Sequence, residues 1–355
     1  MFVRDELLFN NVSSSRKKEE KGWVQFRGIM TKPQCSVQLQ GQKMYTFVQI
    51  DEDTFRAEYL FHARQNPNGA AYGGLIFSQA FAAAERTVPE EFKPNSVHSY
   101  FVSAVIYTIP VIYKVRRIRD GKGFITRTVE AIQKDKTCFL LQVSFHKVPN
   151  ITARQPEKDG MIHQDVMPKV PKPETLMSMK EAVISTKKLV TEGGLVLKPG
   201  MLNRLMQLDN KAYVTNNDMF EARCTNLGNW YGYSSDLKPE LCVWMKTREP
   251  IGDDEKLHRW LLACMSDAIL IPAAMSAHFS QGFEDNFHVS LDHCLYFHSH
   301  EFRVDDWFLF ECKSTVSSGG RAFINGRIWR KDGKLIASCQ QEAIIRGKDG
   351  QISKL

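Results

Sequence analysis

The chain repeats one order of predicted elements. In each copy an apolar helix precedes four segments with the alternation and the turn spacing of antiparallel strands. The first copy has a helix near 74–88 and strands near 96–105, 109–118, 123–134 and 137–147; the second has a helix near 254–271 and strands near 287–298, 307–316, 322–331 and 335–346. A helix followed by an antiparallel meander indicates an α+β unit, so we predict an α+β fold built by internal duplication.

Matching residues in the two copies support this duplication. Their separation along the chain is nearly constant, although each match alone would be weak. The matched sets are Ser78-Gln79-Ala80-Phe81 with Ser266-Asp267-Ala268-Ile269, Tyr100-Phe101 with Tyr296-Phe297, Gly123-Phe124-Ile125 with Ala322-Phe323-Ile324, and Lys134-Asp135 with Lys331-Asp332.

The duplication divides the chain into five predicted segments. Residues 1–45 form a polar extension, 46–148 the first unit with an opening strand near 54–60, and 149–198 a linker rich in Pro and Lys. Residues 199–350 form the second unit with an insertion near 200–250, and 351–355 a tail. Pro272 is expected to stop or kink the second helix.

The composition favours a soluble globular protein inside the cell. Hydrophobic residues make up 43% and charged residues 25% of the chain. We find no apolar run of the roughly eighteen residues that a membrane helix needs, and the start of the chain lacks the apolar core of a secretory signal. We therefore expect no membrane span.

Cysteine and histidine patterns do not indicate a metal site. The eight cysteines are scattered singly without a CxxC pair, which favours reduced core residues. His288, His293, His298 and His300 lie close in sequence, but strand alternation would place His293 on the opposite face from the other three. The net charge of +7 favours a phosphate-bearing small molecule, and no nucleic-acid-binding motif accompanies it.

The chain ends in Ser353-Lys354-Leu355. This tripeptide at a free carboxyl terminus is an address that the peroxisomal import receptor reads. We therefore expect the peroxisome matrix as the location. Peroxisomes handle fatty acyl groups as coenzyme A thioesters, which narrows the expected substrates.

Asp267 is an acidic residue in an apolar helical pattern. Trp260, Cys264 and Ile271 recur around it at helical spacing. A carboxylate there must find hydrogen-bond donors or raise its pKa, and such exceptions to local rules tend to mark functional sites. A capping or otherwise satisfied structural Asp is the alternative.

The duplication makes the two copies chemically unequal at this position. Asp267 corresponds to Gln79, whose amide cannot accept a proton near neutral pH. Gly73 and Gly74 open the first helix, where amide groups stabilise developing negative charge. We infer one composite site, with the base from the second copy and oxyanion donors from the first. The alternative is that the glycines merely begin a helix.

Ser290 and Gln341 interrupt apolar strands of the second copy. A helix packed across that sheet could bring Asp267, Ser290 and Gln341 together around one water. Cys264 and Cys294 are alternative acyl-accepting nucleophiles, although neither has an evident electropositive, exposed setting.

At these residues the chain resembles the acyl-CoA thioesterase II family, particularly its peroxisomal members, over roughly 46–148 and 220–346. The resemblance rests on Tyr72-Gly-Gly-Leu-Ile-Phe-Ser-Gln-Ala, Thr87-Val-Pro-Glu-Glu and His98-Ser-Tyr-Phe in the first copy, and on Ser266-Asp267, Leu291-Asp-His, Tyr296-Phe-His and Gln341-Glu342 in the second. It implies a double hotdog fold of two antiparallel sheets, each wrapped around a central helix.

The resemblance also implies hydrolysis of fatty acyl-CoA to free fatty acid and CoA without a cofactor. Asp267, Ser290 and Gln341 fall on the family's catalytic positions, and amides at Gly73, Gly74 and Leu75 would bind the oxyanion. An enoyl-CoA hydratase-like hotdog enzyme remains an alternative, although Asp285 and His288 do not match its spacing. A catalytically inactive acyl-CoA-binding protein is another. Hotdog sheets often associate further, which leaves a homo-oligomer open.

Overall fold

The computed structural model describes residues 36–62, 69–147, 161–209, 219–233 and 238–355. The predicted extension up to residue 35 and the start of the predicted linker lie outside these ranges. The helices are α1 (Ser36–Met44), α2 (Gly73–Glu85), α3 (Met179–Thr191), α4 (Pro199–Asp209), α6 (Leu227–Tyr231), α7 (Glu255–Met265) and α8 (Leu270–Phe279), with 3-10 turns at Pro173–Thr175 and Lys348–Gly350.

The strands of the first unit are β1 (Phe47–Asp51), β2 (Thr54–Ala57), β3 (Phe92–Phe101), β4 (Val111–Asp120), β5 (Phe124–Gln133) and β6 (Lys136–Lys147). Those of the second are β7 (Phe220–Cys224), β8 (Glu240–Thr247), β9 (Asp285–Ser290), β10 (Asp292–Phe297), β11 (Phe308–Ser318), β12 (Arg321–Arg330) and β13 (Leu335–Gly347). The four strands predicted in each copy are present, and α2 begins one residue before its predicted start.

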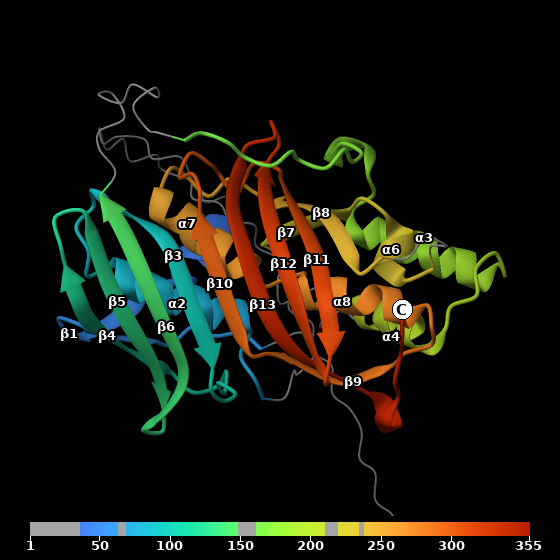
Figure 1. Ribbon diagram of the computed structural model, residues 1–355, viewed down its shortest axis with the longest axis horizontal. Coiled ribbons are helices and arrows are strands. Elements are labelled where there is room, and N and C mark those ends of the chain that lie inside the picture. Colours follow the sequence, from blue (N-terminus) through green and yellow to red (C-terminus); the bar gives the residue numbers. More distant parts are fainter. Residues whose placement is uncertain (1–35, 63–68, 148–160, 210–218, 234–237) are drawn as a thin grey trace, which may run out of the picture. The chain divides into compact units, whose positions relative to one another are not determined.

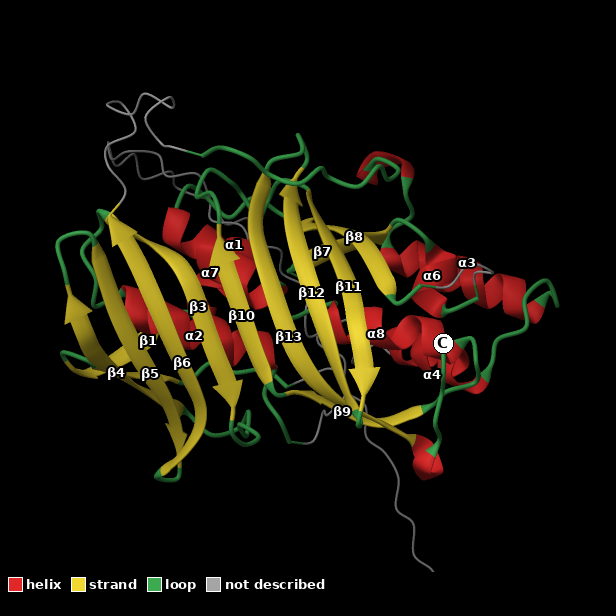
Figure 2. Cartoon of the chain, viewed as in Figure 1, coloured by secondary structure: helices red, strands yellow, loops and turns green. Residues whose placement is uncertain are grey.

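Within the described residues, the two predicted sheets join into one antiparallel sheet of 13 strands (Figure 2). Its order is β1-β2-β4-β5-β6-β3-β10-β13-β12-β11-β8-β7, and β9 pairs with β13. The halves meet where β3 pairs with β10, with Ser96 opposite Tyr296 and Tyr100 opposite Asp292. This pairing removes the free edge that each sheet would otherwise present.

The core helices lie together on one face of this sheet (Figure 1). Helix α2 contacts β3, β4, β5 and β6, and α8 contacts β8, β11 and β12. Helix α7 packs against α2, which joins the two halves behind the sheet. After Gly73, every residue of α2 is buried, because the helix has the sheet on one side and α7 on the other.

The helix predicted over 254–271 is two helices, and Asp267 lies in the turn between them. Helix α7 ends at Met265 and α8 begins at Leu270, so Pro272 falls in the first turn of α8. A proline removes its own N–H bond and its ring clashes with the carbonyl four residues earlier, here that of Ala268. The predicted kink therefore occurs, but before Pro272.

The strand predicted over 287–298 is also divided, at Leu291. Ser290 lies opposite Ala343 and Cys294 lies opposite Gln340. Four residues of β9 and β10 therefore advance against three of β13, which is a β-bulge. The bulge changes which side chains face the interior. The alternation predicted for the histidines was wrong here, because both His288 and His293 turn inward.

Two predicted irregular segments contain ordered structure. Residues 36–44 of the predicted extension form α1, in which Val37 and Met44 are buried. Part of the predicted linker lies over the opposite face of the sheet, where Met167, Val170 and Leu176 pack against Trp244, Leu309 and Trp329. The indole N–H of Trp244 donates to the Pro171 carbonyl at 2.9 Å.

The stretch Glu255–Ser280 is long and apolar enough to cross a membrane. The expectation that no such stretch exists was therefore wrong as far as length and composition go. In the fold, 83% of its most apolar window is buried inside the protein. The stretch therefore has the environment of core helices.

Candidate active site

Asp267, Ser290 and Gln341 meet where the turn between α7 and α8 faces the sheet. Ser290 is the last residue of β9, and Gln341 points inward from β13. The Ser290 hydroxyl donates to Asp267 Oδ1 at 3.5 Å, and Gln341 Nε2 donates to Ser290 Oγ at 2.7 Å. Gln341 also donates to the Asp267 carboxylate. Three residues predicted from separate elements thus form one hydrogen-bonded cluster.

The Asp267 carboxyl has a strongly raised pKa. Removal from water raises it to about 7, while hydrogen bonds from the Gly74 amide, Gln341 and Ser290 act in the opposite direction. A carboxyl with such a pKa is half ionised near neutral pH and can take a proton from a reacting group. The residue itself is partly exposed.

The start of α2 approaches Asp267 closely. A Cβ on Gly73 would lie 3.1 Å from Asp267 Oδ2 and 3.2 Å from the Phe101 ring. A Cβ on Gly74 would lie 2.4 Å from the backbone oxygen of Cys264, at the contact between α2 and α7. The Tyr72 hydroxyl also donates to that oxygen, at 3.1 Å. Both glycines are therefore needed for close packing.

The amides of Gly73, Gly74 and Leu75 do not act alike. The Gly74 N–H donates to Asp267, and the Leu75 N–H donates to the Tyr72 carbonyl at 3.1 Å. Within the described part of the chain, the Gly73 N–H has no hydrogen-bond partner. Two of the three amides are thus already engaged, and the oxyanion role of the three stays a prediction.

Gln79, the counterpart of Asp267, occupies a closed position. Its Nε2 donates to the carbonyls of Met44 and Tyr59 at 2.7 and 3.0 Å, and its Oε1 accepts from the Tyr113 hydroxyl at 2.8 Å. Gln79 is fully buried. The first half contributes the start of α2 to the cluster around Asp267. Gln79 instead forms hydrogen bonds inside the core of the first half.

Comparison with known proteins identifies the family. A model of the acyl-CoA thioesterase N-terminal domain matches residues 61–146, and an acyl-CoA thioesterase model matches residues 226–344. Acyl-coenzyme A thioesterase 8 of Mus musculus is 33% identical over 84% of this chain and 86% of its own length. The chain belongs to the acyl-CoA thioesterase family. The expectation of a thioester hydrolase is confirmed at this level.

Other similar proteins agree with this family. The peroxisomal acyl-coenzyme A thioester hydrolase 1 of Saccharomyces cerevisiae is 26% identical over 86% of this chain and 93% of its own length. The acyl-CoA thioesterase II TesB2 of Mycobacterium marinum superposes with a TM-score of 0.65 at 26% identity, covering 88% of this chain and all of that one.

A second solved structure confirms the fold. A protein of Alicyclobacillus acidocaldarius, described as having a hot dog fold, superposes with a TM-score of 0.63 and covers 87% of this chain and 98% of that one. At 14% identity it bears on the fold alone. With the duplicated helix and sheet, it confirms the predicted double hotdog fold.

The alternative nucleophiles have unfavourable settings for thioesterase chemistry. Burial raises the pKa of Cys294, which keeps its thiol protonated. Cys264 is fully buried in α7. Elsewhere, His288 Nδ1 lies 2.7 Å from Asp285 Oδ2, although these residues did not match the hydratase spacing. No group of three or more metal-ligating side chains occurs in the described ranges.

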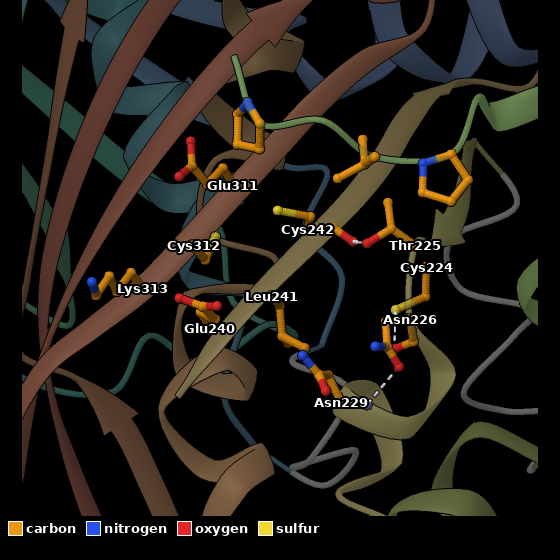
Figure 3. Close-up of a pocket in the computed structure, with 13 residues that line it drawn as sticks. Cys224, Thr225, Asn226, Asn229, Glu240, Leu241, Cys242, Glu311, Cys312 and Lys313 are labelled. Atoms are coloured by element: carbon orange, nitrogen blue, oxygen red, sulfur yellow. Dashed lines mark hydrogen bonds between the residues drawn. The ribbon is translucent and has the colours of Figure 1, made fainter. Parts of the chain in front are cut away.

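A cavity of about 330 Å³ lies away from this cluster. Strands β8 and β11, the connection from β7 to α6, and Pro168, Val170 and Pro171 of the linker surround it (Figure 3). Asp267, Ser290 and Gln341 do not line this cavity. Its cysteines are poor nucleophiles, because burial raises the pKa values of Cys224 and Cys242 to about 12.

Sequence reasoning missed one polar residue that touches the cluster. His293 is fully buried, and its Nδ1 lies 2.8 Å from Gln341 Oε1. Strand alternation from Ser290 would have directed His293 away from Gln341. The bulge at Leu291 reverses that direction, and no residue pattern in the chain indicates the bulge.

Proposed function

We propose that this protein hydrolyses fatty acyl-CoA to a free fatty acid and CoA, with Asp267 as the general base. The observation that carries the proposal is the contact of Asp267 with Ser290 and Gln341, combined with the raised pKa of its carboxyl. The names of the relatives support acyl-CoA as the substrate class. No cofactor takes part in the proposed reaction.

In the proposed mechanism, the Asp267 carboxylate removes a proton from a bound water. The water oxygen forms a bond to the thioester carbonyl carbon, which gives a tetrahedral oxyanion. The carbon–sulfur bond then breaks, and the proton held by Asp267 passes to the departing thiolate of CoA. Ser290 and Gln341 orient the carboxylate, which supplies the geometry that such a reaction requires.

The oxyanion is proposed to form at the start of α2. The Gly73 amide is the donor that remains open there, since Gly74 and Leu75 are engaged. The positive end of the α2 dipole adds to its effect. The first half would thus stabilise the oxyanion, with the Gly73 amide as the direct donor.

Replacement of Asp267 by Asn tests this function. Asp267→Asn keeps the shape of the side chain and removes the base, so release of free thiol from a long-chain acyl-CoA should fall by about 10²- to 10⁴-fold. The matched control is Asp306→Asn on an exposed loop, which should leave turnover unchanged. Near-normal turnover by a folded Asp267→Asn protein would remove Asp267 from the mechanism.

The same assay separates the other two functions. A hydratase would consume an enoyl-CoA without releasing thiol, and an inactive binding protein would retain acyl-CoA without consuming it. A panel of acyl-CoA esters of graded chain length would also define the preferred substrate. Thiol release from at least one member of the panel is the expected result.

We further propose that Ser353-Lys354-Leu355 directs the protein to the peroxisome matrix through the import receptor. Lys354 and Leu355 are exposed, and Ser353 Oγ lies 3.0 Å from His278 Nδ1. The yeast relative named as peroxisomal supports this location. Removing the tripeptide from a fluorescent fusion should abolish overlap with a peroxisomal marker while thiol release stays unchanged. Retained overlap would contradict the proposal.

A further inference from the structure

His293 is a buried polar residue that the proposed chemistry does not use. It lies on β10, next to the bulge at Leu291, and has no exposed surface. Its ring contacts Phe77 edge to face, with the ring centroids 4.7 Å apart. Its two nitrogens contact different partners: Nδ1 lies 2.8 Å from Gln341 Oε1, and Nε2 lies 2.8 Å from Ser266 Oγ.

The hydrogen-bond partners of Gln341 determine which ring nitrogen carries the proton. In the ionised form that the proposed reaction needs, the Asp267 carboxylate is an acceptor only, so the NH₂ group of Gln341 must face Asp267 and Ser290. The Gln341 oxygen then faces His293, and Nδ1 must donate to it. Nε2 is then an acceptor 2.8 Å from Ser266 Oγ, whose single proton also has the Ala263 carbonyl within reach at 2.8 Å.

The reverse orientation of the Gln341 amide is unfavourable. It would direct the amide oxygen at the Asp267 carboxylate, and two acceptors would face each other in a buried setting. Ser266 lies directly before Asp267, so the chain of contacts begins and ends beside the same carboxylate. A donor at the His293 Nδ1 position holds the amide in the favourable orientation from the other side, together with the contacts to Ser290 and Asp267.

We propose that His293 is a positioning residue that fixes the orientation of the Gln341 amide and thereby holds Asp267 in its reactive geometry. This inference rests on the proposed function of Asp267. His293 acts through Gln341 and does not itself exchange protons with the substrate. Burial supports this role, because it lowers the pKa of His293 to about 4 and keeps the ring neutral.

Two amide substitutions separate the two contacts of the ring. The side-chain nitrogen of His293→Asn takes the place of Nδ1 and can donate to Gln341. In His293→Gln the longer side chain carries its amide towards Ser266 instead. We expect His293→Gln and His293→Leu to lower kcat by about 10²-fold with KM little changed, and His293→Asn to recover most of the loss. Equal losses in all three variants would overturn the inference.

A double-mutant cycle tests the path through Gln341. In a Gln341→Ala protein there is no amide to orient, so His293→Leu should reduce kcat little further. Multiplicative losses would show that His293 acts independently of Gln341 and would overturn the inference. Loss of turnover in Asp267→Asn with full turnover in His293→Leu would overturn it while leaving the proposed function intact. Normal turnover in Asp267→Asn would overturn both the proposed role of Asp267 and the inference about His293.

A measurement on the unaltered protein covers the case in which the variants do not fold. Nitrogen-15 NMR of histidine-labelled protein reports which ring nitrogen carries the proton. The expected result is a neutral His293 with its proton on Nδ1. A proton on Nε2 would leave Gln341 without its donor and would overturn the inference.

Discussion

At the scale of single residues, the ionised form of Asp267, which the proposed chemistry needs, makes the fold less stable than the protonated form does. The pKa of its carboxyl is about 7 in the folded chain and ordinarily 3.8. The folded state therefore holds a proton that the unfolded state has lost between these values, and stability decreases as the pH rises through this window. The full loss is roughly 4 kcal/mol by linkage. Such a cost is typical of functional positions.

The same raised pKa predicts how turnover depends on pH. Because only the ionised carboxyl accepts a proton, kcat/KM should rise by about tenfold per pH unit below pH 7 and become level above it. Ser290→Ala removes a hydrogen bond that lowers the pKa of Asp267, so the midpoint should move to higher pH. The measurement is thiol release over a range of pH, and a flat profile would exclude Asp267 as the base.

The two glycines at the start of α2 should respond differently to an added methyl group. In Gly73→Ala the methyl would meet Asp267 Oδ2 and the movable Phe101 ring, so turnover should fall at least about tenfold with stability retained. In Gly74→Ala it would meet the Cys264 carbonyl at 2.4 Å, which should cost about 1–3 kcal/mol of stability. Urea unfolding and thiol release measured on both variants check this. A greater loss of stability in Gly73→Ala would contradict it.

At the scale of elements, a buried ion pair joins the end of α2 to the middle of α7. Arg259 Nη2 donates to Glu85 Oε1 at 2.7 Å, and the Trp260 indole donates to Glu85 Oε2 at 2.6 Å. Glu85→Ala leaves the guanidinium buried without this partner and should cost roughly 3–5 kcal/mol. Glu58→Ala, in the exposed pair with Arg56, should cost less than about 1 kcal/mol. Similar midpoints for the two variants in urea would contradict this.

The residue pattern could not predict where a helix or a strand is interrupted. Periodicity predicted the core helices and the meander strands, because buried faces leave a regular apolar pattern. The break between α7 and α8 was displaced from Pro272, because a proline disturbs the turn that precedes it. The bulge at Leu291 had no signal, since it depends on how β9 and β10 pair with β13. His293 was therefore missed.

At the scale of the whole molecule, two copies of one fold have become chemically different. The duplication correctly predicted that Asp267 and the start of α2, which lie close together, come from opposite halves. The joining of the two sheets through β3 and β10 could not be predicted, because backbone amides and carbonyls form that pairing whatever the side chains. Asp267 lies beside this joint: Phe101, which follows Tyr100 at the end of β3, donates its N–H to the Leu291 carbonyl at 2.8 Å.

The unequal halves predict that a carboxylate at position 79 cannot replace Asp267. Gln79→Glu keeps the length of the side chain but removes the NH₂ group that donates to the Met44 and Tyr59 carbonyls. Two buried acceptors would then lose their donor beside a buried charge, at a cost of more than about 2 kcal/mol. Gln142→Glu, on the exposed face of β6, should cost little.

In an Asp267→Asn protein, Gln79→Glu should restore no thiol release, because position 79 is sealed in the core and lacks the glycine approach, the serine and the glutamine that surround Asp267. Urea unfolding measures the cost of the substitution, and the thiol assay measures rescue. Recovered turnover in the double variant would mean that both copies can form a working site. The difference between the two copies would then lie in the side chains at positions 79 and 267 alone, and the surrounding contacts would not determine which half reacts.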